Sequence, residues 1–394
     1  MSNSELPKGW KAIELGEITS YVNRGVAPKY TDEHGITVIN QKCIREGNIN
    51  LELARVHNPD KKYTAEKQLH LGDILINSTG VGTAGRVGIF TDSINAIVDT
   101  HVSIVRLNKE YAYPKFVYYN LRFREKELEE TAEGSTGQIE LKRDAIKSLN
   151  ILLPQLTEQK AIADVLSSLD DKIDLLHKQN QTLEDMAQTL FREWFIEKAD
   201  EGWEEMPLSE VCSVTAGYAF KSKDFVDIGV PVVKIKNISN GHIDYNDLQF
   251  IDISESDVES KYRLYDNDIV MAMTGATIGK IGLVSTFEHD YLLLNQRVAV
   301  LRSNHQALLW FMLNSLDLEN EILNLSNGAV QANISSTSIG QVPIPGMSNQ
   351  MMQKFNNAVH PMFEKIQQNK KQIKSLEQTR DTLLPKLMSG QVRV

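Results

Sequence analysis

The sequence contains the same long amphipathic helix pattern twice, and this duplication limits what the chain can fold into. In residues 157–197, seam positions recur in alternating steps of four and three, the spacing of a coiled coil. They are Ile162, Leu166, Leu169, Ile173, Leu176, Asn180, Leu183, Ala187, Leu190 and Trp194. The series returns 193 positions later, within 348–387, as Phe355, Val359, Met362, Ile366, Asn369, Ile373, Leu376, Arg380, Leu383 and Leu387. A repeat of this length predicts two domains rather than a solenoid of short units.

The segments before the two helices repeat as well. The strongest match joins residues 72–88 to 267–282, where a strand-like run enters a Thr-Gly turn, crosses a glycine-rich loop and leaves through a basic residue. Other predicted strands are 36–39 with Ile44 and 149–154 in the first copy, and 230–233 with Ile235 and Ile238 and 342–345 in the second. Residues 99–106 also repeat, as 295–302. Short helices at 116–121 and 308–313 precede polar loops at 134–138 and 327–331.

Charge and the two seam asparagines predict how the helices pair. Residues 157–200 contain 5 Lys and Arg against 10 Asp and Glu, and residues 348–394 contain 8 against 3, so the helices carry complementary charge. In a parallel pair, Asn180 and Asn369 would each face an apolar residue, and each unsatisfied carboxamide would destabilise the pair by about 1–3 kcal/mol. In an antiparallel pair in which the residue numbers of facing positions add up to 549, the two asparagines face each other and fix the register of the helices. The alternative places both asparagines on exposed faces or at kinks. Arg380 would oppose Leu169, with its stem packed and its guanidinium reaching out.

We therefore expect an α+β protein with two mixed α/β globules, 1–156 and 198–347, and two long helices, 157–197 and 348–394. The helices are predicted to form an antiparallel coiled coil that relates the halves by a pseudo-twofold axis. At 1.5 Å per residue, helices of about 35–40 residues would separate the globules by roughly 50–60 Å.

Composition excludes several classes of protein. No apolar run approaches the roughly 20 residues of a membrane helix, and the N-terminus resembles no export signal, so we expect a cytoplasmic protein. Cys43 and Cys212 lie far apart in the sequence and predict buried free thiols rather than a metal site. The net charge of −10, with 9 basic against 19 acidic residues in 201–347, argues against a simple basic nucleic-acid binder.

The sequence contains only incomplete versions of catalytic motifs. The loop at 80–87 has the spacing of a phosphate-binding loop but carries Arg86-Val87 in place of Lys-Ser/Thr, and the loop at 275–281 is one residue short. No amino-methyltransferase motif, dinucleotide fingerprint, nuclease centre or histidine cluster is present. We expect no metal and no cofactor in this chain.

Basic and hydrogen-bonding residues remain on the predicted loops. Such side chains contact phosphates and base edges in protein–DNA complexes, although solvated loop charge is an equally good interpretation of each residue alone. The candidates are Arg24, Lys29, Lys42, Arg45, Asn77, Ser78, Thr79 and Arg86 in the first copy, and Tyr218, Lys221, Lys223, Lys234, Lys236, Asn237, Thr274, Lys280 and Arg297 in the second.

Over essentially its whole length the chain resembles the specificity (S) subunits of type I restriction–modification systems. The resemblance rests on the tandem plan and on four strings. They are Pro-Lys-Gly-Trp at 7–10, Pro-Gln-Leu-Thr-Glu-Gln-Lys-Ala-Ile-Ala-Asp-Val-Leu-Ser-Ser-Leu at 154–169, Leu-Phe-Arg-Glu-Trp-Phe at 190–195 and Leu-Met-Ser-Gly-Gln-Val at 387–392. The second copy departs from the pattern at Asn349-Gln350 and at Pro361, where a kink would disturb the outermost seam layers.

The resemblance implies a non-catalytic reader of double-stranded DNA. Each target recognition domain would bind one half of a bipartite, asymmetric site, and the helices would set the spacing and dock two methylation subunits. S-adenosylmethionine, ATP and Mg²⁺ would belong to the methylation and restriction subunits. If partner subunits supply much of the phosphate contact, the acidic balance of 201–347 is compatible with DNA reading, and this chain would bind DNA weakly alone. An adaptor that binds only proteins and an autonomous enzyme are the alternatives. Selection of a bipartite DNA sequence would argue against the first, and methyl transfer by the chain alone would support the second.

Overall fold

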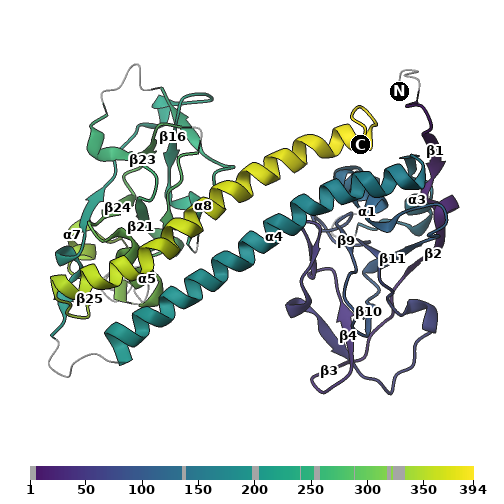
Figure 1. The fold of residues 1–394 in the computed structure, drawn as a ribbon, viewed down its shortest axis with the longest axis horizontal. Coiled ribbons are helices and arrows are strands. Elements are labelled where there is room, and N and C mark those ends of the chain that lie inside the picture. The colour runs from purple at the N-terminus through teal and green to yellow at the C-terminus, as the bar shows by residue number, and fades with distance from the viewer. Residues whose placement is uncertain are drawn as a thin grey trace. The chain divides into compact units, whose positions relative to one another are not determined.

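The chain forms two compact units, each built from a globule and parts of both long helices. The computed structural model describes residues 6–134, 139–197, 204–239, 241–252, 258–287, 289–316, 321–322 and 333–394. The first unit comprises Met1–Ile173 with Ser375–Val394, and the second comprises Asp174–Lys374. Helices α4 (Leu156–Arg192) and α8 (Asn349–Met388) therefore each contribute one part to either unit (Figure 1). Two mixed α/β globules with two long helices confirm the predicted fold class.

Among its described residues, the globule of the first unit contains two four-stranded sheets and two pairs of strands. Antiparallel strands β2 (Thr19–Arg24), β11 (Val102–Leu107), β8 (Ile74–Asn77) and β9 (Val87–Ile89) form one sheet in that order. The second has the order β10 (Ala96–Val98), β4 (Ile36–Ile39), β7 (Arg55–His57), β3 (Tyr30–Thr31), with β10 parallel to β4. The hairpin β5 (Ile44–Arg45) and β6 (Asn48–Ile49), and the pair β1 (Lys11–Glu14) and β12 (Asn150–Leu153), complete the strands described. The α-helices that the structure describes before α4 are α1 (Pro114–Phe123), α2 (Glu125–Thr131) and α3 (Arg143–Lys147).

The globule of the second unit repeats this plan. Its antiparallel sheet has the order β14 (Ser213–Ala216), β24 (Val298–Arg302), β21 (Ile269–Ala272), β22 (Ile281–Leu283). The other has the order β15 (Phe225–Val226), β19 (Gln249–Ile251), β16 (Val230–Val233), β23 (Leu292–Leu294), β20 (Arg263–Leu264). The remaining strands described are the hairpin β17 (Ile238–Ser239) and β18 (His242–Ile243), and the pair β13 (Met206–Pro207) and β25 (Pro343–Ile344). Helices α5 (Gln306–Ser315) and α7 (Ser336–Gly340) precede α8.

An arginine–aspartate pair occupies the same place in both globules. Arg106 of β11 makes two bonds to Asp73, Nε to Oδ1 at 2.8 Å and Nη2 to Oδ2 at 2.7 Å. Arg302 of β24 bonds Asp268 in the same way at 2.8 and 2.6 Å. Two parallel, charge-assisted bonds hold the loop before β8 or β21 against the neighbouring strand. The repetition of this pair shows that the copies share side-chain chemistry as well as strand order.

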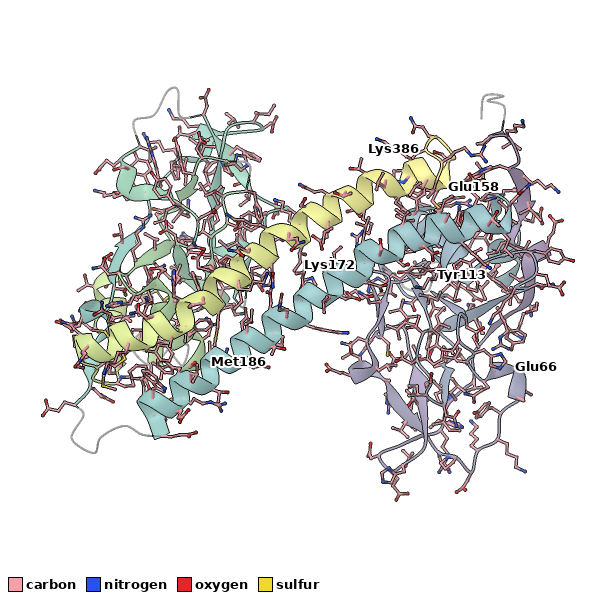
Figure 2. The ribbon with its side chains drawn as sticks, in the orientation of Figure 1. Glu66, Tyr113, Glu158, Lys172, Met186 and Lys386 are labelled. Carbon is pink, nitrogen blue, oxygen red and sulfur yellow. The ribbon has the colours of Figure 1, made fainter. Side chains whose placement is uncertain are left out.

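In the first unit, Asp170 of α4 joins three side chains. It accepts from Tyr119 Oη of α1 at 2.8 Å and from Arg380 Nη1 of α8 at 2.9 Å, and Arg122 Nη1 lies 3.3 Å away. Near the opposite end of the paired segments, Arg393 makes two bonds to Glu158, at 2.8 and 2.7 Å. Glu158 lies near the start of α4, and Lys386 marks the last turns of α8 beside it (Figure 2). Low numbers on α4 thus meet high numbers on α8, which is an antiparallel arrangement.

In the second unit the helices also run antiparallel. Asn369 Nδ2 donates to Asn180 Oδ1 at 2.8 Å and to Gln179 Oε1 at 2.9 Å. Farther along, the rings of Trp194 and Phe355 meet edge to face with centroids 5.6 Å apart. Both Asn180 with Asn369 and Trp194 with Phe355 sum to 549, the predicted register.

Several details differ from the sequence predictions. Helix α8 runs unbroken through Pro361, and Phe355 and Val359 are fully buried, so the outermost layers pack. The Arg380 side chain is only 14% exposed and pairs with Asp170 instead of reaching into solvent. Ile235 starts a 3₁₀ turn rather than a strand. The side-chain oxygen of Asn237 accepts a hydrogen bond from the Lys234 backbone amide, and this bond stabilises the turn.

The remaining predictions concern the loops, the cysteines and membrane spans. Residues 135–138 and 327–331 of the predicted polar loops lie outside the described residues. Cys43 and Cys212 are buried free thiols, as predicted, and burial raises the pKa of Cys212 to about 12. Within the described part of the chain, none of the helices has the length and apolar character to cross a bilayer.

Candidate nucleic-acid interface

Three loops meet at one end of the antiparallel sheet in the first unit. They are the glycine-rich loop 78–86 between β8 and β9, the turn 99–101 before β11, and the segment 139–141, and together they are called the first loop cluster. Ser78 N donates to His101 O at 2.8 Å, and Leu141 N donates to Ser78 O at 2.8 Å. Thr79 also forms an isolated bridge with Glu140. Residues far apart in the sequence are thereby fixed side by side.

The second unit has the same arrangement, the second loop cluster, made of residues 273–280, 295–297 and 333–334. Met273 N donates to Arg297 O at 3.0 Å, and Ile334 N donates to Met273 O at 3.0 Å. Thr274 forms the isolated bridge with Asn333 that corresponds to Thr79 with Glu140. Both globules therefore present an equivalent set of loops.

Glycine is required where each glycine-rich loop returns to the sheet. Gly85 has φ +86° and donates to Asn77 O at 2.8 Å, and Gly279 has φ +82° and donates to Ala272 O at 2.9 Å. A Cβ on Gly85 would lie 2.7 Å from the Glu129 amide nitrogen, so a side chain would clash as well as strain the backbone.

Most polar side chains of the first loop cluster have partners within the protein. Arg24 lies at the end of the adjacent strand β2, and its Nη2 atom is 2.8 Å from Glu140 Oε1. Arg86 Nη2 donates to Gly82 O at 2.8 Å. Thr79 Oγ1 and His101 Nδ1 are 2.7 Å apart, and the His101 side chain is exposed. The structure therefore places Thr79 against His101, a residue that the sequence predictions did not include, and pairs Arg24 and Arg86 with other groups of the same cluster.

Further candidates from the sequence lie on or beside the second loop cluster. Thr274 and Lys280 are half-buried on the glycine-rich loop, and Arg297 is exposed on the neighbouring turn. Tyr218 is 42% exposed, and its backbone forms a bridge with Asn295. A threonine, a lysine, an arginine and a tyrosine with an accessible ring lie on connected loops, which is a set suited to phosphates and base edges.

Three of the predicted DNA contacts are buried, and their side chains hold the fold instead. Asn77 and Ser78 have no exposed surface, and Asn237 is 1% exposed. Asn77 Nδ2 donates to the Gln41 carbonyl at 3.0 Å, and the Ser78 hydroxyl lies 2.6 Å from that of Ser103. Asn237 closes its own turn. Their polar side chains provide hydrogen-bond partners for buried groups. They therefore stabilise the fold and are not candidates for contact with DNA.

The other candidates lie outside the two loop clusters. Lys29, Lys42, Lys221 and Lys223 are exposed, and Arg45 pairs with Glu46 at 3.2 Å. Lys234 Nζ lies 3.5 Å from the centroid of the Phe225 ring and bonds Gln249 Oε1, and Lys236 pairs with Asp247 at 2.7 Å. Burial, followed by the charge of Lys236, lowers the pKa of Lys234. Lys42 follows Gln41, whose carbonyl bonds Asn77, and so borders the first loop cluster.

The sequence profile described as "Type I restriction modification DNA specificity domain" matches residues 7–185 and, a second time, residues 200–378. The chain belongs to this specificity family. The family predicted from the sequence is thereby confirmed, and the two matched segments each contain one loop cluster.

Members of the family align over the full length of the chain. It is 23% identical to the HindI specificity subunit of Haemophilus influenzae, over 97% of this chain and 99% of that one. It is 25% identical to the MjaVIII specificity subunit of Methanocaldococcus jannaschii, over 100% and 95%. The crystal structure of the S subunit from M. genitalium shares the fold, with a TM-score of 0.65 at 20% identity over 98% of both chains.

Within the described residues, no group of three or more His, Cys, Asp or Glu side chains could hold a metal ion.

Proposed function

We propose that this chain is the DNA-recognition subunit of a type I restriction–modification complex and that each globule reads one half of a bipartite, asymmetric site. The observation that carries the proposal is the doubled loop cluster: two sets of loops with equivalent backbone bonds but different side chains, inside the two segments matched by the specificity family. Equivalent scaffolds with different side chains would bind DNA in similar ways and read different sequences.

The two long helices are proposed to set the spacing between the half-sites and to dock two methylation subunits. Support comes from the antiparallel contacts inside each unit, where Asp170, Asn180 and Asn369 join side chains across the seam. Restriction subunits would join through the assembled complex. S-adenosylmethionine, ATP and Mg²⁺ would be bound by those partners, and this chain would supply the sequence readout.

The charge of the chain supports a division of labour. Residues 201–347 contain 9 basic and 19 acidic residues, which is unsuited to a protein that holds the phosphate backbone by itself. Partner subunits would supply much of the phosphate contact, and the loop clusters would supply base contacts. The isolated chain should therefore bind DNA weakly, and the complex should bind tightly.

Selection from a randomised DNA pool tests the proposal. The chain is assembled with the methylation subunits of its own system, and bound duplexes are recovered and sequenced at fixed salt, since affinity for DNA depends steeply on salt. The expected result is two short conserved blocks separated by a fixed gap. Absence of any enriched sequence from the assembled complex would contradict the proposal, as would tight and salt-insensitive binding by the isolated chain.

A further inference from the structure

Four pairs of equivalent backbone bonds place His101 and Arg297 at the same position in their globules. Ser78 N bonds His101 O at 2.8 Å, and Met273 N bonds Arg297 O at 3.0 Å. The turns themselves match, with Val102 N to Asp99 O at 3.3 Å and Val298 N to Asn295 O at 2.9 Å.

The other two pairs tie these turns to the rest of each globule. They are Asp99 N to Ile39 O at 3.1 Å and Asn295 N to Val233 O at 3.2 Å, and Gly25 N to Val102 O at 3.1 Å and Gly217 N to Val298 O at 3.0 Å. The two residues are therefore fixed by the same backbone framework.

Both side chains stand on rigid turns. Residues Val98 and Val102 on either side of the first turn have no exposed surface, and neither do Leu294 and Val298 beside the second. His101 and Arg297 themselves are exposed. An exposed polar side chain on a turn anchored by buried strands at both ends is well placed to bind a ligand without reordering the backbone.

The chemistry of the two side chains differs. The guanidinium of Arg297 carries only donors in a planar fork, which matches the O6 and N7 acceptors of guanine in the major groove. In the first globule, the Thr79 hydroxyl engages His101 Nδ1 at 2.7 Å. If that hydroxyl donates, the ring proton lies on Nε2, which becomes a single donor for a purine acceptor.

We infer that His101 and Arg297 are the corresponding base-reading positions of the two globules and that their difference makes the half-sites unlike. Arg297 reads a guanine through two donors, and His101 reads a purine through one. The inference rests on the proposed DNA-recognition function and adds to it one specificity-determining residue in each half. The neighbouring Arg24 and Arg86 are paired with Glu140 and Gly82, as described above, and act in holding the first loop cluster.

Base-by-base competition measures the inferred contacts. The full chain is assembled with its methylation subunits, the bipartite sequence is determined, and competitor duplexes carry each of the four bases at every position of both half-sites. Arg297→Ala should reduce discrimination at one position of one half-site about tenfold, the size expected for loss of a two-donor contact with guanine. His101→Ala should reduce discrimination by less, at one position of the other half-site.

Exchanged side chains give a second readout. His101→Arg should introduce a preference for guanine in the first half-site and leave the second unchanged, and Arg297→His should relax the guanine in the second. Matched controls are His70→Arg in the first unit and Lys261→His in the second, because both residues are exposed and lie outside the loop clusters. Neither control should change the sequence preference.

Each other outcome is decisive. Equal loss of affinity for all competitors would mean that the residues contact phosphate, and unchanged discrimination would mean no contact, so both results overturn the inference. A variant that fails to fold, judged by thermal melting, would contradict the exposed placement. If the unsubstituted complex selected no bipartite sequence, the proposed function would fail before the inference was reached.

Discussion

Asn369 Nδ2 donates a 2.8 Å hydrogen bond to Asn180 Oδ1 across the pair of long helices in the second unit. Asn369 has no exposed surface and Asn180 is 7% exposed, and apolar residues flank both along the seam. A shift of one helix by a single heptad would bury each carboxamide against hydrocarbon. The bond therefore favours one register over its neighbours.

Replacement of the asparagines separately and together tests this register key. Asn180→Leu alone leaves the Asn369 donors buried with a partner missing and should lower the free energy of unfolding by about 1–3 kcal/mol. The double variant with Asn369→Leu should recover most of that loss, because two apolar side chains can pack where two amides bonded. Denaturant titration of the four proteins gives the coupling energy, and strictly additive losses would show that the two amides do not interact.

The helix register could be predicted from sequence because its determinants are local. A seven-residue pattern with one asparagine in each copy admits few alignments. The pattern did not predict that Phe191, Phe195 and Phe363 are also buried. These residues lie off the seam, because α4 and α8 pack on the globule as well as on each other, and the residues that cover them are far away in the sequence.

Asp170→Asn should destabilise the first unit. The carboxylate accepts from Tyr119 and Arg380 and lies beside Arg122, and its side chain is 21% exposed. Loss of its charge removes the carboxylate partner of Arg122, which is 18% exposed, and leaves Arg380, which is 14% exposed, with Asp381 as its remaining carboxylate. We expect a loss of about 1.5–3 kcal/mol, the range for hydrogen bonds to charged groups. Thermal and denaturant melts measure it.

The neighbouring substitution Asp171→Asn provides the control for Asp170. Asp171 is exposed on the same helix turn, and its replacement by asparagine removes the same charge from the chain as Asp170→Asn does. Its effect should stay within about 0.5 kcal/mol, as for an ordinary surface substitution. Equal effects of the two substitutions would contradict the role given to Asp170.

Acid should weaken the contact between Glu158 and the C-terminal segment. Hydrogen bonds from Arg393 lower the pKa of Glu158 below its ordinary value of 4.5. A lowered pKa in the folded state contributes stability above the ordinary pKa, and that contribution is lost as pH falls through the lowered value. Unfolding measured from pH 6 to pH 3 should therefore be less pH-dependent in Arg393→Gln than in the unsubstituted chain. Lys160→Gln, an exposed change on α4, should keep the full dependence, and identical profiles for all three proteins would refute the assignment.

The candidate site could be predicted only in part. Repeated strings in the sequence correspond to repeated loops in space, so the candidates Thr79, Arg86, Thr274, Lys280 and Arg297 lie in the loop clusters. Asn77, Ser78 and Asn237 were also singled out, but their side chains bond the Gln41 carbonyl, the Ser103 hydroxyl and the Asp247 carbonyl of other segments. Whether a polar residue at the end of a strand faces solvent depends on those distant neighbours. His101 was missed because its type differs from Arg297, although its position in the repeat corresponds.

Lengthening both helices should lengthen the gap between the half-sites. A second copy of 173–179 before Ile173 and a second copy of 370–376 after Leu376 add one heptad to each helix at opposed positions and preserve the asparagine pairing. Seven residues add about 10 Å of helix, or about three base pairs at 3.4 Å each. Sequencing of the DNA selected by the complex measures the gap. Insertion in one helix alone should break the register and stability together, and an unchanged gap with both insertions would contradict the spacer role.

Exchange of one globule tests most directly the central claim that each globule reads one half-site independently. Residues 201–347 are replaced by the corresponding segment of another specificity subunit, the chain is assembled with its own methylation subunits, and the methylated sequence is determined. The account predicts that one half-site changes to that of the donor, while the other half-site and the length of the gap stay the same. A simultaneous change in both half-sites would contradict it.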